Sequence, residues 1–142
     1  MAAVLRDSVF YAAAFTSKFL ADARRMGGRV VPLPFEVTAV SVATVGDTYN
    51  CTVIPSNARV IGLECTTTTN AGTITWQLGD AGSATRYMAA TVFATVNTQG
   101  VLAATGAGFT PTADTIVVGL FGVVAPTVGA KVTGCIYVIP GA

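Results

Sequence analysis

Histidine is missing from this sequence of 142 residues, and only 11% of the residues are charged. The missing histidine removes the commonest general base of enzymes and the commonest metal ligand. Globular chains usually carry about 25% charged residues, which keep their surfaces soluble. We therefore expect much of the surface of this protein to be covered in an assembly.

A long hydrophobic run is also missing. The most apolar stretch, TIVVGLFGVVAPTV at 115–128, contains two glycines and a proline. It is shorter than the roughly 20 residues that a membrane-spanning helix needs. Near the N-terminus, the basic residues mostly follow the apolar segment, which is the reverse of a secretory signal peptide. The sequence predicts a mature protein with no membrane partner.

Cysteine is scarce, and its spacing contains no paired motif. Cys51, Cys65 and Cys135 are far apart, and each stands among apolar or strand-forming residues. An odd number of cysteines without a CxxC pair argues against a metal site or a disulfide framework. We expect buried free thiols, which are typical of a protein made in a reducing cytoplasm.

From residue 32 onward, short runs of β-branched and aromatic residues alternate with turn residues. This pattern predicts an all-β fold, an antiparallel β-sandwich or jelly roll of seven to eight strands with an N-terminal arm or short helix. The expected strands are 34–43, 48–54, 58–67, 72–78, 84–93, 114–124 and 130–139, with a weaker one at 100–104.

Alternation along two of these strands indicates which side chains face the core. Trp76 and Leu78 share one face of their strand, as every second residue does. Ile61, Leu63 and Cys65 share a face in the same way. We expect Trp76 to be a core residue.

The last two strands are apolar on both faces. In the first of them, Ile116, Val118 and Leu120 form one face, and Val117 and Phe121 form the other. A solvated antiparallel sheet normally has one polar face. A neighbouring subunit could cover the second apolar face.

The chain divides into an arm at 1–31 and a β-sandwich body at 32–142. Residues 1–29 contain five basic and two acidic residues, a balance of +3, whereas the rest of the chain has a balance of −2. Pro32 and Pro34 suit the boundary between the two parts, because proline ends a helix and stiffens the chain that follows.

The arm contains the residues that we expect to bind a partner. Tyr11, Phe15 and Phe19 recur at i, i+4 and i+8, which is typical of one stripe of a helix; an extended arm is the alternative. Arg24 and Arg25 follow them. We expect the stripe to dock on a neighbour. The small positive charge of the arm makes nucleic acid an unfavoured partner.

The stretch QLGDAGSATRYM at 77–88 raises the question of a phosphate-binding loop. It has no lysine at the P-loop position, and a strand rather than a helix follows it. The segment GDAG therefore predicts a hairpin turn whose glycines adopt positive φ. Asp47, Asp80 and Asp114 each stand beside a turn and are expected to be turn formers. We assign no catalytic, cofactor-binding or metal-binding residue, and predict a protein that is not an enzyme and has no small-molecule substrate.

Residues 45–92 resemble a recurring pattern in virion structural proteins of tailed bacteriophages. In that pattern a strand leads to an IPxxARV turn, and a later strand ends in LGD before a small-residue turn and an arginine–aromatic pair. The matching residues here are Ile54, Pro55, Ala58, Arg59 and Val60, then Leu78, Gly79, Asp80, Arg86 and Tyr87.

This resemblance implies a jelly-roll-like protein that decorates or cements a capsid. The partners would be the major capsid protein and further copies of the chain, forming a trimer. The protein would be made in the cytoplasm of the bacterial host and then lie on the capsid surface.

Two other classes stay open from the sequence alone. One is another virion component, such as a head-fibre base, a tail protein or an adsorption protein with a glycan-binding face. Such a face would require Trp76, Tyr87 or Tyr137 to be exposed. The other class is a small enzyme, which the missing histidine and the scattered acids disfavour.

Overall fold

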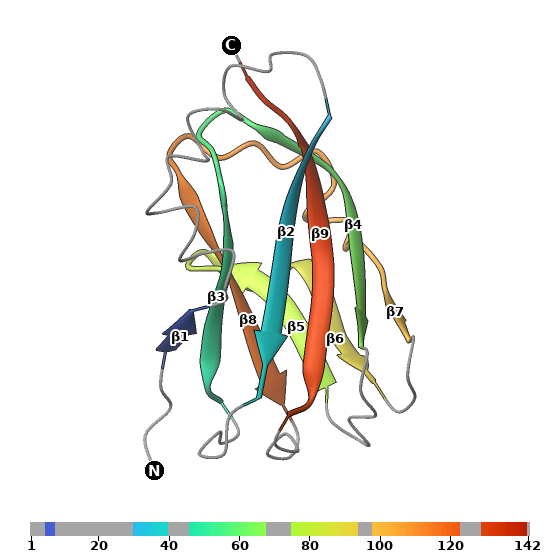
Figure 1. Ribbon diagram of the computed structural model, residues 1–142. Coiled ribbons are helices and arrows are strands. Elements are labelled where there is room, and N and C mark those ends of the chain that lie inside the picture. Colours follow the sequence, from blue (N-terminus) through green and yellow to red (C-terminus); the bar gives the residue numbers. More distant parts are fainter. Residues whose placement is uncertain are drawn as a thin grey trace.

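The computed structural model describes residues 5–7, 30–39, 46–67, 75–93, 98–122 and 129–141, which form two facing β-sheets (Figure 1). One sheet has the order β1-β3-β8-β5-β6, and the other has the order β2-β9-β4-β7. The strands are β1 (Leu5–Asp7), β2 (Val31–Thr38), β3 (Thr48–Ile54), β4 (Arg59–Thr67), β5 (Thr75–Asp80), β6 (Ser83–Val92), β7 (Gln99–Gly100), β8 (Thr115–Gly122) and β9 (Lys131–Ile139).

These strands confirm the predicted antiparallel β-sandwich. Strands β2 to β6, β8 and β9 correspond to seven of the predicted runs, and every pairing among β2 to β9 is antiparallel. The weaker predicted run at 100–104 is wrong except at Gly100, the last residue of β7. Strand β1 adds to the edge of β3 in parallel, with Leu5 opposite Thr48 and Asp7 opposite Asn50. Within the described ranges no helix is long and apolar enough to cross a membrane.

Strand β2 begins at Val31 rather than at residue 34, so Pro32 and Pro34 lie inside the strand. Proline lacks the N–H that a central strand needs, but it is tolerated on an edge strand. Strand β2 is such an edge, because it pairs only with β9. Its alternate residues Leu33 and Phe35 are buried against the other sheet.

The core between the sheets is centred on aromatic residues, as predicted for Trp76. Trp76 is fully buried. Its ring centroid lies 4.6 Å from that of Phe121 and 6.2 Å from that of Tyr49. Full burial of a large apolar side chain contributes about 1.5–3 kcal/mol. The largest buried side chains are Trp76, Tyr87, Phe35, Phe93, Phe121, Leu33, Ile54, Leu78, Met88, Ile136 and Val37.

The prediction that Ile61 shares a face of β4 with Cys65 is wrong. Val60 is fully buried and Ile61 is 40% exposed. The pairing with β9 shifts register between Val60 and Gly62. A bulge of this kind inserts one residue and reverses the alternation on one side of it. Cys65, beyond the bulge, faces inward as predicted.

The segment GDAG is a hairpin turn, as predicted, because Ala81 and Gly82 join β5 to β6. The prediction of positive φ is wrong for both of its glycines, since neither has a φ in the left-handed region. The Asp80 carboxylate holds the turn instead. Its Oδ1 accepts hydrogen bonds from the backbone N–H groups of Gly82 (2.9 Å) and Ser83 (3.0 Å).

Candidate docking groove

The outer face of β8 is apolar, as the sequence predicts. Val117 and Phe121 point into the core and are buried. Ile116, Val118 and Leu120 alternate with them and face away from the core. Ile116 is 37% exposed, and Val118 and Leu120 are half-buried. Strand β8 therefore has apolar side chains on both faces.

These three side chains form the floor of a groove of about 600 Å³ on the outer face of the five-stranded sheet. The groove crosses β3, β8 and β5, which are neighbours in the sheet. Polar groups form its rim. Its lining residues are Thr48, Asn50, Gln77, Asp80, Ala81, Ala84, Asp114, Thr115, Ile116, Val118 and Leu120.

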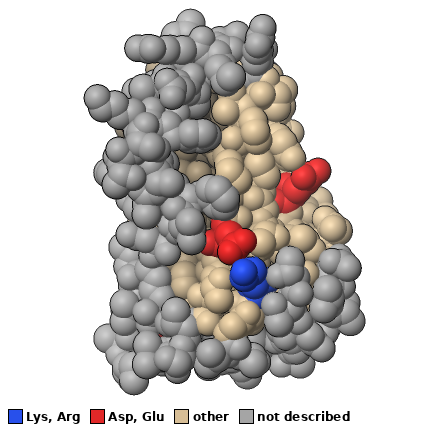
Figure 2. Space-filling model, in the orientation of Figure 1, with Lys and Arg blue, Asp and Glu red and all other residues tan. Residues whose placement is uncertain are grey.

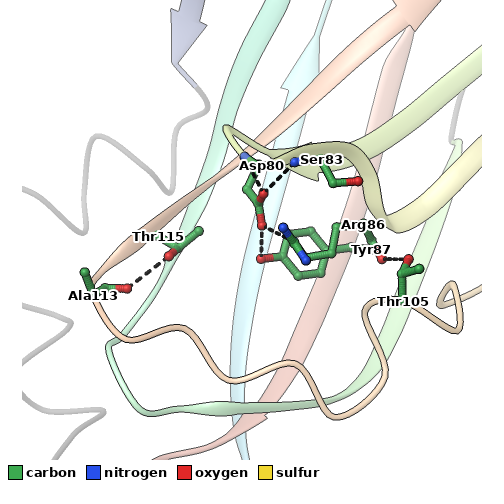
Figure 3. A network of polar contacts seen from close by, with 8 residues as sticks. Asp80, Ser83, Arg86, Tyr87, Thr105, Ala113 and Thr115 are labelled. Atoms are coloured by element: carbon green, nitrogen blue, oxygen red, sulfur yellow. Dashed lines mark hydrogen bonds and ion pairs between the residues drawn. The ribbon is translucent and has the colours of Figure 1, made fainter.

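A network of hydrogen bonds centred on Asp80 fixes one end of the groove (Figure 3). Asp80 is only 8% exposed. Its Oδ2 accepts hydrogen bonds from Arg86 Nε (2.7 Å) and from the Tyr87 hydroxyl (2.8 Å). Burial alone would raise the pKa of Asp80, but the hydrogen bonds from Arg86, Tyr87 and the turn outweigh it and hold this pKa below its ordinary value. The carboxylate is therefore ionised at neutral pH, and burial together with this carboxylate raises the pKa of Tyr87.

The loop between β7 and β8 packs on the same network. The N–H of Ala103 donates to the carbonyl of Tyr87 (2.8 Å), and the Thr105 hydroxyl donates to the carbonyl of Arg86 (2.9 Å). The Arg86 guanidinium lies 4.2 Å from the centroid of the Phe109 ring, a cation–π contact. The LGD and arginine–tyrosine residues of the sequence pattern thus have a structural role. They hold the hairpin and the loop together.

The outer face of the four-stranded sheet is different in character. It carries an ion pair between Lys131 and Glu36 (3.3 Å) and a hydrogen bond from the Tyr137 hydroxyl to Glu64 Oε2 (2.8 Å). Figure 2 views the molecule from this side and shows few charged side chains. The two outer faces therefore offer a partner different chemistry, because one has an apolar groove and the other has polar and charged side chains.

The three cysteines are free thiols, as predicted. Cys51 and Cys65 are buried, and burial raises the pKa of the Cys65 thiol to about 12. Cys135 departs from the prediction, because it is only half-buried on the outer face of β9. Burial raises its pKa as well. All three are protonated and unreactive at neutral pH.

Two of the three predicted turn aspartates, Asp80 and Asp114, line the groove on β8. Asp80 is in the hairpin network, Asp47 is buried, and Asp114 is exposed and accepts a hydrogen bond from the N–H of Ser56 (2.9 Å). No group of three or more acidic or cysteine side chains among the described residues could hold a metal ion.

The predicted partner-binding residues lie outside the described residues. These are Tyr11, Phe15, Phe19, Arg24 and Arg25. Sequence reasoning missed the polar rim of the groove, because its members come from separate strands. Gln77, between Trp76 and Leu78 on β5, is one such member, and only the strand order brings it beside Leu120.

No family model and no curated protein sequence matches the chain. Solved structures that are similar to it include chains from three bacteriophage capsids. A chain of the cyanophage Pam1 capsid asymmetric unit has a TM-score of 0.63 and 28% sequence identity, over 80% of this chain and 87% of that one. A chain of the capsid of Ralstonia phage GP4 has a TM-score of 0.70 and 14% identity, over 98% of this chain and 99% of that one.

The third is a chain of the acidic stable capsid of Helicobacter pylori bacteriophage KHP30. It has a TM-score of 0.58 and 17% identity, over 81% of this chain and 91% of that one. The β-sandwich of this protein is thus a fold that occurs in the capsid structures of three bacteriophages.

Proposed function

We propose that this chain is a bacteriophage virion structural protein that decorates and cements the capsid shell. The observation that carries the proposal is the similarity to a chain of the cyanophage Pam1 capsid, at 28% identity over most of both chains. The sequence resemblance over residues 45–92 supports the same role, as does the low charge of the whole chain. The role needs no catalytic step, in line with the expectation that the protein is not an enzyme.

The strand order supports a jelly roll in particular. If β2 is counted as the first of eight strands, the sheet β3-β8-β5-β6 has the order two, seven, four, five. The facing sheet, β2-β9-β4-β7, has the order one, eight, three, six. We infer that the chain folds as two interleaved Greek keys, the arrangement of jelly rolls in viral capsid domains.

In this proposal the groove on β8 docks on the major capsid protein. Its floor is formed by Ile116, Val118 and Leu120, which are partly exposed to water. Burial of apolar surface contributes about 25 cal/mol per Å², and many copies on one shell act together through avidity. Each decorating subunit thereby adds contacts across the seams between capsid subunits. The resemblance adds that the protein assembles as a trimer.

The arm supplies a second set of contacts, to the shell or to neighbouring subunits. Tyr11, Phe15 and Phe19 are its apolar anchors, and burial of each contributes about 1.5–3 kcal/mol. Arg24 and Arg25 lie at the rim, where an exposed ion pair contributes about 0–1 kcal/mol. We expect the aromatic residues to dominate the affinity of the arm.

The test is binding of the purified chain to empty shells of its phage. Val118→Asp with Leu120→Asp places two charges in the groove floor, whereas Thr133→Asp places one on the opposite outer face. Because a buried unpaired charge is costly, the groove variant should lose at least about tenfold in affinity, which is about 1.4 kcal/mol. The Thr133 variant should bind normally. Equal binding by both variants would contradict the role of the groove.

The arm is tested in the same assay at two salt concentrations. Phe15→Ala with Phe19→Ala should weaken binding more than Arg24→Ala with Arg25→Ala does. The arginine variant should instead make binding less dependent on salt, because salt screens exposed charges. Normal binding by a chain that lacks residues 1–29 would rule out the arm as a docking element.

A further inference from the structure

The outer face of the four-stranded sheet presents a tyrosine ring laid along the sheet. Tyr137 on β9 lies opposite Gly62 on β4. A Cβ built at Gly62 would lie 3.4 Å from Tyr137 Cδ2, so the ring leans over β4 where that strand has no side chain. Its hydroxyl reaches Glu64, two residues further along β4, and donates a hydrogen bond of 2.8 Å. This hydrogen bond raises the pKa of Tyr137 to about 12, so the ring is neutral at physiological pH.

A polar hollow of about 450 Å³ adjoins this ring and shares Glu64 with it. Its wall offers a carboxylate, an amide and two hydroxyl groups from three neighbouring strands. Cys135, beside Glu64 in register, contributes a protonated thiol. The lining residues are Glu64, Cys65, Thr66, Gln99, Thr133, Gly134 and Cys135.

The charged side chains on this face restrict the chemical class of ligand that it could bind. The described charged residues of β2, β9 and β4 are Glu36, Glu64, Lys131 and Arg59. Lys131 is paired with Glu36, and Arg59 stands at the first residue of β4, opposite Ile139. A phosphate or carboxylate ligand in the hollow would meet Glu64, and no lysine or arginine is among the described residues that line the hollow. A purely apolar ligand would leave the carboxylate and the Gln99 amide without partners, which is costly.

A neutral sugar has the matching chemistry. One face of a hexose ring consists of C–H groups that can pack on an aromatic ring, and its edges carry hydroxyl groups that both donate and accept. A carboxylate accepts two such hydroxyls, and an amide or a threonine hydroxyl can donate or accept. Tyrosine combines an apolar ring with a polar end in the same way.

We propose that this face is a saccharide-binding site, in which Tyr137 stacks on a neutral hexose and Glu64, Gln99 and Thr133 bind its hydroxyl groups. The site goes beyond the proposed cement function and does not depend on it. It lies on the opposite sheet from the groove, so one molecule could hold a shell and a glycan together. Of the three aromatic residues that a glycan-binding face could use, Trp76 and Tyr87 are fully buried. Tyr137 is the one on the surface.

The test is a titration of the ¹⁵N-labelled full chain with neutral methyl glycosides of glucose, galactose, mannose and N-acetylglucosamine, followed by NMR. At least one glycoside should shift the amide signals of Gly62, Glu64, Thr133 and Tyr137, with a Kd on the order of 1 mM. Tyr137→Ala should weaken that binding at least tenfold, and so should Glu64→Gln. Ile139→Ala, which removes an apolar side chain on the same face of β9, should leave it unchanged.

A thermal melt of each variant separates loss of binding from loss of the fold, and Glu64→Gln is the variant expected to keep the native melting temperature. The proposal is overturned by an absence of shifts with all four glycosides or by shifts that cluster at the groove on β8. Equal binding by the Tyr137→Ala variant, or tighter binding of inorganic phosphate than of any glycoside, would also overturn it. The assay uses no shells, so its failure leaves the cement function untouched.

Discussion

The Asp80 side chain holds the hairpin between β5 and β6 and ties it to Arg86 and Tyr87. It accepts hydrogen bonds from two turn amides, from Arg86 and from Tyr87. A turn aspartate was predictable from the LGDAG pattern. Its long-range partners were not, because the six-residue spacing to Arg86 becomes a contact only once β5 and β6 pair across a two-residue turn.

Asp80→Asn should destabilise the protein by about 2–3 kcal/mol, because it leaves Arg86 without its anionic partner. Tyr87→Phe should cost less, about 1 kcal/mol, because Asp80 keeps three other donors. Denaturant unfolding at pH 7 measures both. A change within error for Asp80→Asn would mean that the network contributes nothing to stability.

The same network predicts a dependence on pH. The folded-state pKa of Asp80 is lowered, so its contribution is complete above the unfolded pKa of about 3.9 and is lost as the pH falls through the folded value. The stability difference between the native chain and Asp80→Asn should therefore shrink below about pH 4. A difference that stays constant down to pH 2 would contradict this role of the carboxylate.

At the scale of elements, the strands were predictable and their irregularities were not. Short runs of β-branched and aromatic residues between turns locate the strands, and alternation gives the buried face of β5. The bulge beside Ile61 left no signal in the sequence, since it depends on the register with β9. From the sequence, only the apolar outer face of β8 was predicted, and not the groove itself. The polar rim could not be predicted without the strand order, because its residues come from separate strands.

Gly79 and Gly82 make a matched pair for testing the hairpin. A Cβ at Gly79 would collide with the backbone of Ser83 and Ala84, whereas at Gly82 it would mainly meet the guanidinium of Arg86, a side-chain group that can shift more easily than backbone. Gly79→Ala should destabilise the protein by about 3 kcal/mol, and Gly82→Ala by about 1 kcal/mol or less. Thermal unfolding of the two variants compares them. Similar melting temperatures would refute the close approach at Gly79.

For the whole molecule, the two outer faces and the low charge point to an assembled state. We predict that the purified chain is a stable oligomer at micromolar concentration, and the resemblance to virion structural proteins of tailed bacteriophages makes a trimer the expected size. Val118→Asp with Leu120→Asp tests in addition whether the groove takes part in that oligomer. Analytical ultracentrifugation gives the mass directly. A monomer would count against the inference drawn from the scarcity of charged residues.

The central claim is that this chain lies on the outside of a phage capsid. Electron cryo-microscopy of virions that carry a bulky tag fused to the C-terminus of the chain tests it most directly. The account predicts extra density repeated over the outer surface of the head, at sites between capsid subunits, with none on the tail. Density confined to the tail or to a single vertex, or its absence from the particle, would contradict the account.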